Sequence, residues 1–244
     1  MKIFKYAIAI LILGVGFSAC QKDLLEEKPT NVLVASQFFQ SAADAEIALN
    51  GAYNSLQNDW TFDFVGAPVH WGNKGVDELN TPNWAAGGRK ELQLYQITSN
   101  MVAIENLWQG HFESINVVNG VVDRVAAMSD ELIDSERRAE IIAEAKFIRA
   151  ILYFSAVKIW ENVPLITSET TSLNDIEVSQ ATPDAVYAQI ISDLQEAESV
   201  LEQGQGGGRA TQGAAATLLG KVYLQMTGHP LNQTDKFAMA VEQF

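Results

Sequence analysis

The chain has 244 residues, of which 48% are hydrophobic and 19% are charged, so it is long enough for one large or two modest domains and too apolar for a disordered chain. Its formal net charge is −14 at pH 7. This charge argues against a partner that is a nucleic acid or an anionic lipid surface, because like charges repel.

The first element along the chain is a signal peptide, predicted over residues 1–19. Lys2 and Lys5 precede an apolar stretch, Tyr6 to Phe17, that is too short to span a bilayer comfortably. Small residues then lead to Cys20, which is the only cysteine in the sequence and has no partner for an internal disulfide. The alternative interpretation of this segment is an N-terminal membrane-anchor helix.

The residues Phe17-Ser18-Ala19-Cys20 resemble the bacterial lipobox, whose cysteine is lipidated on sulfur and becomes the new N-terminus. The resemblance implies lipidation at Cys20. Several acyl chains on one residue suffice for stable anchoring. No later hydrophobic run is long enough to cross a bilayer, so we expect a chain that is anchored to a membrane and does not span it. Residues 20–35 are polar and acidic at their start and are predicted to form a tether.

Helices joined by loops are predicted for residues 36–244. Ser41 followed by Asp44 is typical of a capping box, and apolar residues at helical spacing follow, so a first helix is expected over 41–57. Residues 58–98 then show little periodicity and many Gly, Pro, Asn and Trp residues. A loop of this length is usually functional or disordered, and its aromatic residues argue against disorder.

Two long helices are expected next, over 101–128 and 133–160, and the short polar turn between them lets them pair. The second is apolar almost all round from Phe147 to Ile159, which indicates packing on several sides. It should end before Val163-Pro164, because the residue before a proline disfavours helix. Arg149 lies in this apolar run, so we expect an ion pair or backbone carbonyls around it in preference to a ligand.

A fourth helix is predicted over 183–202. Thr182-Pro183-Asp184 provides a capping threonine, a proline in the first turn and an acid, and the glycine-rich run 204–208 ends the helix. That run lacks the G-K-[ST] ending and the preceding strand of a phosphate-binding loop, so we expect a flexible connector.

Two last helices are expected over 211–227 and from Thr234 onward, the latter still running at Phe244, which favours a chain truncated in mid-helix over a short closing helix. Leu219-Gly220-Lys221-Val222-Tyr223 resembles the first helix of a tetratricopeptide repeat, and Ala240 with Phe244 resembles the second. Any antiparallel helix pair with small interface residues is the alternative. The predicted class is all-α, with tetratricopeptide-like helical hairpins, long irregular loops and at most a small strand between residues 65 and 95.

Three segments together resemble the SusD/RagB family. The first runs from Glu144 to Ala150 and continues through Tyr153-Phe154 to Val163-Pro164-Leu165. The second is Arg209-Ala210-Thr211 with Ala214-Ala215 and Leu219 to Leu224. The third is the lipobox together with the acidic stretch and the proline that follow it. Weaker similarities are Gly51-Ala52-Tyr53, Trp108 with Ile115 and Asn119, and Asp193-Leu194 with Ala197.

The resemblance implies a non-catalytic lipoprotein on the outer surface of a Bacteroidota-type bacterium. Members bind oligosaccharides, or sometimes peptides, and pass them to a SusC-like TonB-dependent transporter in the outer membrane. Members are normally much longer, so this chain would be roughly their N-terminal half. The alternative function is a helical-repeat scaffold for protein interactions. A glycan-degrading enzyme is disfavoured, because neither paired carboxylates nor a nucleophile is placed by a motif. No cofactor is expected, and the three histidines lack metal-ligand spacing.

Candidate ligand-binding residues lie in the long loop. Proteins bind sugars in water with aromatic faces and with planar amides, acids and arginine. The loop supplies this mixture in Trp60, Trp71, Trp84, Asp77, Asn80, Asn83 and Arg89. Trp84 is the first choice for a binding platform, because its neighbours Pro82, Asn83 and Gly87-Gly88 indicate an exposed turn. Alternatively, these tryptophans only hold the loop against the helices.

Overall fold

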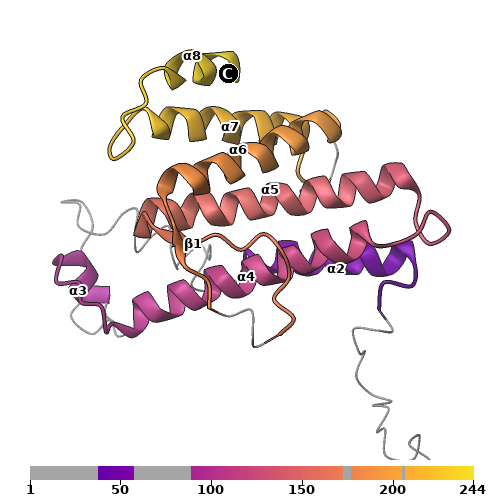
Figure 1. Ribbon diagram of the computed structural model, residues 1–244, viewed down its shortest axis with the longest axis horizontal. Helices are drawn as coiled ribbons and strands as arrows, with labels where there is room; N and C mark the ends of the chain where they lie inside the picture. Colours follow the sequence, from indigo (N-terminus) through magenta and orange to yellow (C-terminus); the bar gives the residue numbers. More distant parts are fainter. Residues whose placement is uncertain (1–37, 58–88, 173–176, 205–206) are drawn as a thin grey trace, which may run out of the picture. The chain divides into compact units, whose positions relative to one another are not determined.

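The computed structural model describes residues 38–57, 89–172, 177–204 and 207–244. Its elements, in chain order, are α2 (Ala42–Ser55), α3 (Arg89–Gln93), α4 (Val102–Ala126), α5 (Ser135–Trp160), β1 (Val163–Pro164), β2 (Gln180–Ala181), α6 (Pro183–Val200), α7 (Gln212–Met226) and α8 (Lys236–Glu242) (Figure 1). They belong to one unit, Phe39–Phe244, and the preceding unit, Met1–Phe38, lies almost wholly outside the described residues. The predicted signal peptide, Cys20 and the tether fall in that preceding unit. The all-α prediction is confirmed.

Each helix from α4 to α8 packs on the next one, so the helices form a stack (Figure 1). The predicted pairing of α4 with α5 is confirmed, and α2 lies against both of them. α5 is the centre of the stack, since its residues Ile141, Ile148, Leu152 and Tyr153 are fully buried. Its predicted burial on several sides is therefore confirmed. None of the described helices has the length and apolar character that crossing a membrane requires.

The predicted helix starts are confirmed by side-chain caps. The Ser41 hydroxyl accepts a hydrogen bond from the Asp44 amide, and the Asp44 carboxylate accepts one from the Gln40 amide. Thr182 and Thr211 cap α6 and α7 in the same way. Each cap satisfies an amide that has no partner within its helix, which stabilises the start by about 1 kcal/mol.

Two local predictions are wrong. The short helix α3 occupies the end of the segment predicted as loop. The small strand expected between residues 65 and 95 lies mostly outside the described residues, and in the part of the chain that the structure describes, strand pairing joins Val163 to Ala181 and Pro164 to Gln180. α8 ends at Glu242 and does not run to Phe244, because the last amides donate to carbonyls three residues back and tighten the final turn.

The contact between α7 and α8 depends on a glycine, as predicted. A Cβ atom added at Gly220 would lie 2.9 Å from the Phe244 ring and 3.1 Å from the Gln243 Cβ. Ala240 is buried on the facing helix. Small side chains at these two positions therefore let the helices approach closely.

Glu144 joins three distant parts of the sequence. Its carboxylate is fully buried in α5, accepts a hydrogen bond from the Tyr53 hydroxyl at 2.7 Å and lies 3.4 Å from the Arg209 guanidinium. The Tyr53 hydroxyl in turn accepts from the Ala210 amide at 2.8 Å. Burial and the hydrogen bond to Glu144 raise the pKa of Tyr53, so its hydroxyl stays protonated. This network holds α2, α5 and the connection before α7 together.

Candidate functional site

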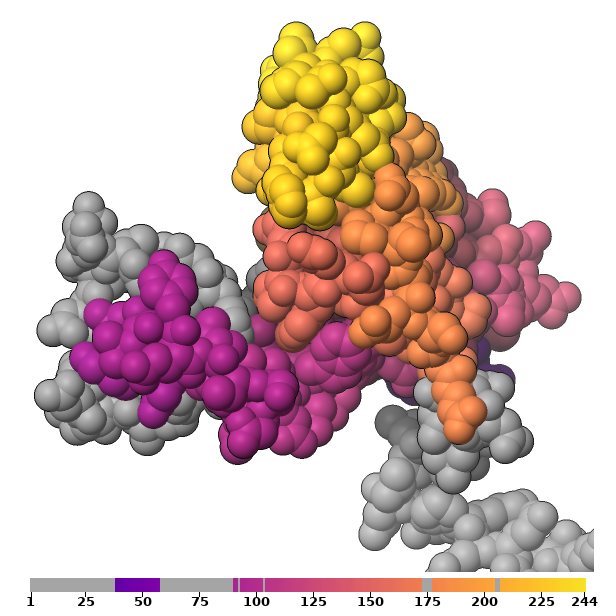
Figure 2. All heavy atoms as spheres, turned by 60° about the vertical axis from the view of Figure 1, so that its left-hand side comes forward, coloured from indigo at the N-terminus to yellow at the C-terminus, as the bar shows by residue number. Residues whose placement is uncertain are grey.

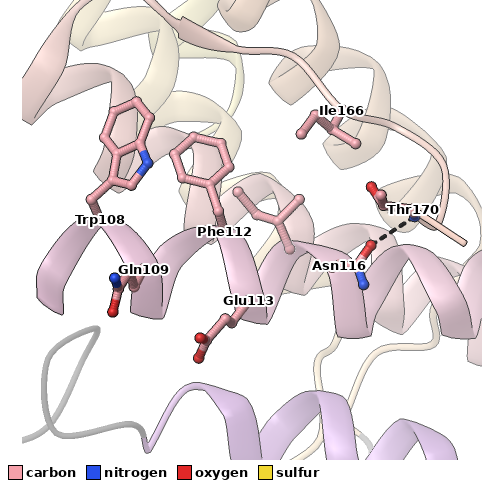
Figure 3. Close-up of a pocket in the computed structure, with 8 residues that line it drawn as sticks. Trp108, Gln109, Phe112, Glu113, Asn116, Ile166 and Thr170 are labelled. Carbon is pink, nitrogen blue, oxygen red and sulfur yellow. Dashed lines mark hydrogen bonds between the residues drawn. The ribbon is translucent and has the colours of Figure 1, made fainter. Parts of the chain in front are cut away.

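A groove on the first half of α4 is the best candidate for a binding site. Its volume is about 380 Å³. Among the described residues, eight line it: Trp108, Gln109, Phe112, Glu113, Ile115, Asn116, Ile166 and Thr170 (Figure 3). Six belong to α4, and the last two belong to the segment after α5. We call this space the α4 groove and we call residues 163–172 the strap.

Two aromatic rings form the apolar wall of the α4 groove. Trp108 and Phe112 are four residues apart, so they lie one above the other on the same side of the helix, and their ring centroids are 4.5 Å apart. Trp160, from the end of α5, meets Trp108 edge-on at 5.1 Å. This third ring supports Trp108 from behind, which fixes the orientation of its face.

His111 holds the aromatic wall to the core. It is fully buried, its Nδ1 lies 2.8 Å from the Leu107 carbonyl, and its Nε2 lies 3.1 Å from the Ser155 hydroxyl of α5. Its ring also meets Trp160 edge-on. Burial lowers the pKa of His111, so the ring is neutral at pH 7. These contacts give His111 a role in packing α4 against α5.

The strap forms the opposite wall because α4 binds its backbone. The Asn119 amide donates to the carbonyls of Ile166 and Ser168, and the Asn116 Oδ1 accepts from the Thr170 amide at 2.8 Å. In Figure 2 the orange atoms of this segment lie over the magenta surface of α4. Paired backbone groups leave the strap little freedom, so the α4 groove has a preformed second wall.

Two further residues of α4 fix the far end of the strap. The Asp123 carboxylate accepts from the Glu169 amide at 2.7 Å, and Arg124 grips the Glu169 carboxylate with two hydrogen bonds. Gly120 makes room for this contact, since a Cβ atom there would lie 3.3 Å from the Glu169 carboxyl carbon. Asn116, Gly120 and Asp123 follow helical spacing, so one face of α4 carries all these contacts.

Arg149 of α5 anchors the strap. An ion pair or backbone carbonyls were predicted around it, and both kinds of partner are confirmed. Its guanidinium binds Asp193 of α6 through two hydrogen bonds of 2.7 and 2.8 Å. It also donates to the Thr167 carbonyl and to the Asn119 Oδ1. Burial disfavours its charge, but the Asp193 carboxylate outweighs burial and the pKa of Arg149 is raised.

Polar side chains border the α4 groove on one edge. In Figure 3 the Trp108 and Phe112 rings rise toward the strap, whereas Gln109 and Glu113 leave the helix on the other side. Both polar side chains are exposed. The Asn116 Oδ1 is bound to the strap, so its amide NH₂ is the group that is left to donate. An apolar wall with hydrogen-bonding groups at its edge can bind a small, partly polar molecule.

Metal-binding clusters are absent from the described part of the chain. Among residues 38–57, 89–172, 177–204 and 207–244, no group of three His, Cys, Asp or Glu could hold a metal ion. The Ser155 hydroxyl lies within hydrogen-bonding distance of His111, but His111 is fully buried and also bound to the Leu107 carbonyl, so this pair joins α4 to α5.

Most of the sequence-predicted site lies outside the described residues. This holds for Trp60, Trp71, Trp84, Asp77, Asn80 and Asn83, whose role stays a prediction. Arg89 begins α3. The α4 groove itself was not predicted, although Trp108, Phe112 and Asn116 recur every four residues beside Gln109 and Glu113. This polar and aromatic stripe was a usable signal.

Comparison with known proteins gives one consistent result. Residues 23–224 match the model of a SusD-like family described as starch-binding and associating with the outer membrane. The chain is 28% identical over 237 residues to SusD-like protein P25 of Formosa agariphila, an alignment that covers 92% of this chain and 44% of that protein.

Solved structures agree. A SusD superfamily protein of Parabacteroides distasonis superposes with a TM-score of 0.69 at 26% identity, over 87% of this chain and 44% of that one. A laminarin-binding SusD-like protein superposes with a TM-score of 0.70 at 26% identity, over 83% and 43%. The chain thus spans less than half the length of these relatives.

Proposed function

Because the chain belongs to the SusD-like family, we propose that it captures oligosaccharides at the cell surface and delivers them to a SusC-like TonB-dependent transporter in the outer membrane. Lipidation at Cys20 would hold it there, which mass spectrometry of the mature N-terminus can test. The family's description as starch-binding and the laminarin-binding relative support a glycan as ligand. In this proposal the chain binds and does not catalyse.

The α4 groove is the observation that carries this proposal. A pyranose ring has an apolar C–H face and a rim of hydroxyls. Trp108 and Phe112 provide the apolar surface against which such a face packs. Gln109, Glu113 and Asn116 provide donors and acceptors for hydroxyls at the edge.

We expect weak affinity from this geometry. The groove is open and its polar groups are exposed to water, so each hydrogen bond to sugar replaces one to solvent. One aromatic contact and a few such bonds correspond to dissociation constants of about micromolar to millimolar. The loop residues predicted from sequence, Trp84 first among them, remain separate candidates for ligand contact.

The test is binding of the purified chain to starch, laminarin and xylan by affinity gels and calorimetry. Phe112→Ala removes half of the aromatic wall and should weaken binding about tenfold or more. Phe237→Ala is the matched control, because Phe237 is an exposed aromatic residue on α8 outside the groove. It should change affinity less than about twofold, within the usual effect of a surface substitution.

Three outcomes would contradict the proposal. Equal losses in both variants would mean that the α4 groove is not the site. No binding to any polysaccharide, together with tight retention of a helical protein partner, would favour a scaffold. Release of reducing ends from a bound polysaccharide would indicate an enzyme.

A further inference from the structure

We infer that the α4 groove selects neutral glycans and rejects those that carry carboxylate or sulfate groups. The inference rests on the proposed function and adds the substrate class. It depends on which charged groups surround the groove, because aromatic and amide groups alone do not distinguish a neutral from an acidic sugar.

Of the groove-lining residues that the structure describes, Glu113 is the only charged one. It is exposed, and no ion pair of the described residues neutralises it. Glu105 lies on the same side of α4 and shares a hydrogen bond with Gln109, which adds a second negative charge near that edge. A sugar carboxylate placed against this edge meets repulsion in place of a partner.

The cations next to the strap already form ion pairs with carboxylates. Arg149 is buried in its ion pair with Asp193. Arg124 is held by Glu169 through both of its forked nitrogens. Neither guanidinium can turn toward an anionic ligand without breaking a two-point contact. The net charge of −14 acts in the same direction at longer range.

The magnitude follows from the distance of the charges. Two unit charges a few ångströms apart at a wet surface repel enough to weaken binding roughly five- to tenfold. Salt screens this repulsion, since the Debye length falls from about 10 Å at 0.1 M to about 3 Å at 1 M. Selectivity against anionic glycans should therefore shrink as salt is added.

The test compares chemical derivatives of one polysaccharide. Laminarin, starch and xylan are each measured by calorimetry as the native, hydroxyethyl and carboxymethyl forms, at 0.05 M and 1 M NaCl. The hydroxyethyl form matches the size of the carboxymethyl form without its charge. We expect the carboxymethyl form to bind about five- to tenfold more weakly than the hydroxyethyl form at low salt, and within twofold of it at high salt.

Two variants assign the effect to its residue. Glu113→Gln should bring the carboxymethyl form within about twofold of the hydroxyethyl form at low salt. Glu131→Gln is the control, because it removes the same charge beyond the end of α4, roughly 20 Å from Glu113 along the helix axis. It should leave the difference in affinity between the two forms unchanged. Equal or tighter binding of the carboxymethyl form, or a difference that Glu113→Gln does not change, would overturn the inference while the proposed function stands. Failure of every form to bind would overturn both.

Discussion

At the scale of residues, the buried charged side chains of the family motifs are each matched by a partner elsewhere in the fold. Arg149 lies in the apolar run of α5, where a cation without partners would be costly, and it is matched by Asp193 on the next helix. Glu144, five residues earlier, is matched by Tyr53 and Arg209. These motif residues support the fold: Arg149 anchors the strap, and Glu144 joins α2, α5 and the connection before α7.

Replacing Arg149 by Met should destabilise the chain by about 3–5 kcal/mol, because Asp193 would stay buried without its cation. Urea unfolding measures this loss. The double variant with Asp193→Leu should lose less than the single one, since an apolar pair leaves no charge behind. Arg124→Met is the control: its ion pair is partly exposed, so the loss should be about 1 kcal/mol or less. Equal losses at Arg124 and Arg149 would contradict this account.

His111 predicts a dependence of stability on pH. Burial lowers its pKa below the unfolded value of 6.5, so the unfolded chain binds the proton more readily. The contribution of the neutral His111 to the free energy of unfolding is then fully present above pH 6.5. It is lost as the pH falls below 6.5, by up to about 1.4 kcal/mol per pH unit.

Urea unfolding between pH 5.5 and 7.5 measures this slope. His111→Gln should flatten it, and His229 stays in both proteins, so that the difference between them isolates His111. Parallel curves for the two proteins would show that the buried imidazole titrates normally.

At the scale of elements, the strap is held by side chains that lie far from it in sequence. Tyr153 of α5 donates its hydroxyl to the Ile166 carbonyl and accepts from the Ile166 amide, at 2.9 and 2.7 Å. Burial raises the pKa of Tyr153 to about 12, so the hydroxyl remains a donor at physiological pH. The strap thus has a partner from α5 as well as those from α4.

Tyr153→Phe removes both hydrogen bonds and leaves the Ile166 amide unpaired, at a cost of about 1–3 kcal/mol, while the Ile166 carbonyl keeps its hydrogen bond from Asn119. The Ile166 amide should then exchange its hydrogen about tenfold faster or more. Tyr187→Phe is the matched control, because in the described part of the chain the Tyr187 hydroxyl makes no hydrogen bond. Unchanged exchange at Ile166 in Tyr153→Phe would mean that the Tyr153 hydroxyl does not hold the strap.

The elements show what local sequence can and cannot predict. The starts of α2, α6 and α7 were predicted because a cap involves residues only three apart. The strap was not predicted, because its order depends on pairs such as Asn116 with Thr170, which are 54 residues apart. The α4 groove has the same origin, since its second wall comes from outside its own helix.

At the scale of the whole molecule, different helices of the stack hold the fold together and form the candidate binding surface. Buried networks on α5 and α6 hold the helices together, while α4 presents its aromatic and polar stripe beside the strap. Fold class and family were predictable, because they depend on helix periodicity and on motifs that build the core. The location of the groove was not predictable, because it depends on the path of the strap over α4.

The most direct test of the account is a titration of the ¹⁵N-tryptophan-labelled chain with neutral laminarin oligosaccharides, observed through its five indole N–H signals. Single Trp→Phe variants assign the signals. The account predicts that the Trp108 signal shifts with the saturation curve of binding and that the Trp108 shift is lost in Phe112→Ala. Saturable binding with an unmoved Trp108 signal would contradict a glycan site in the α4 groove.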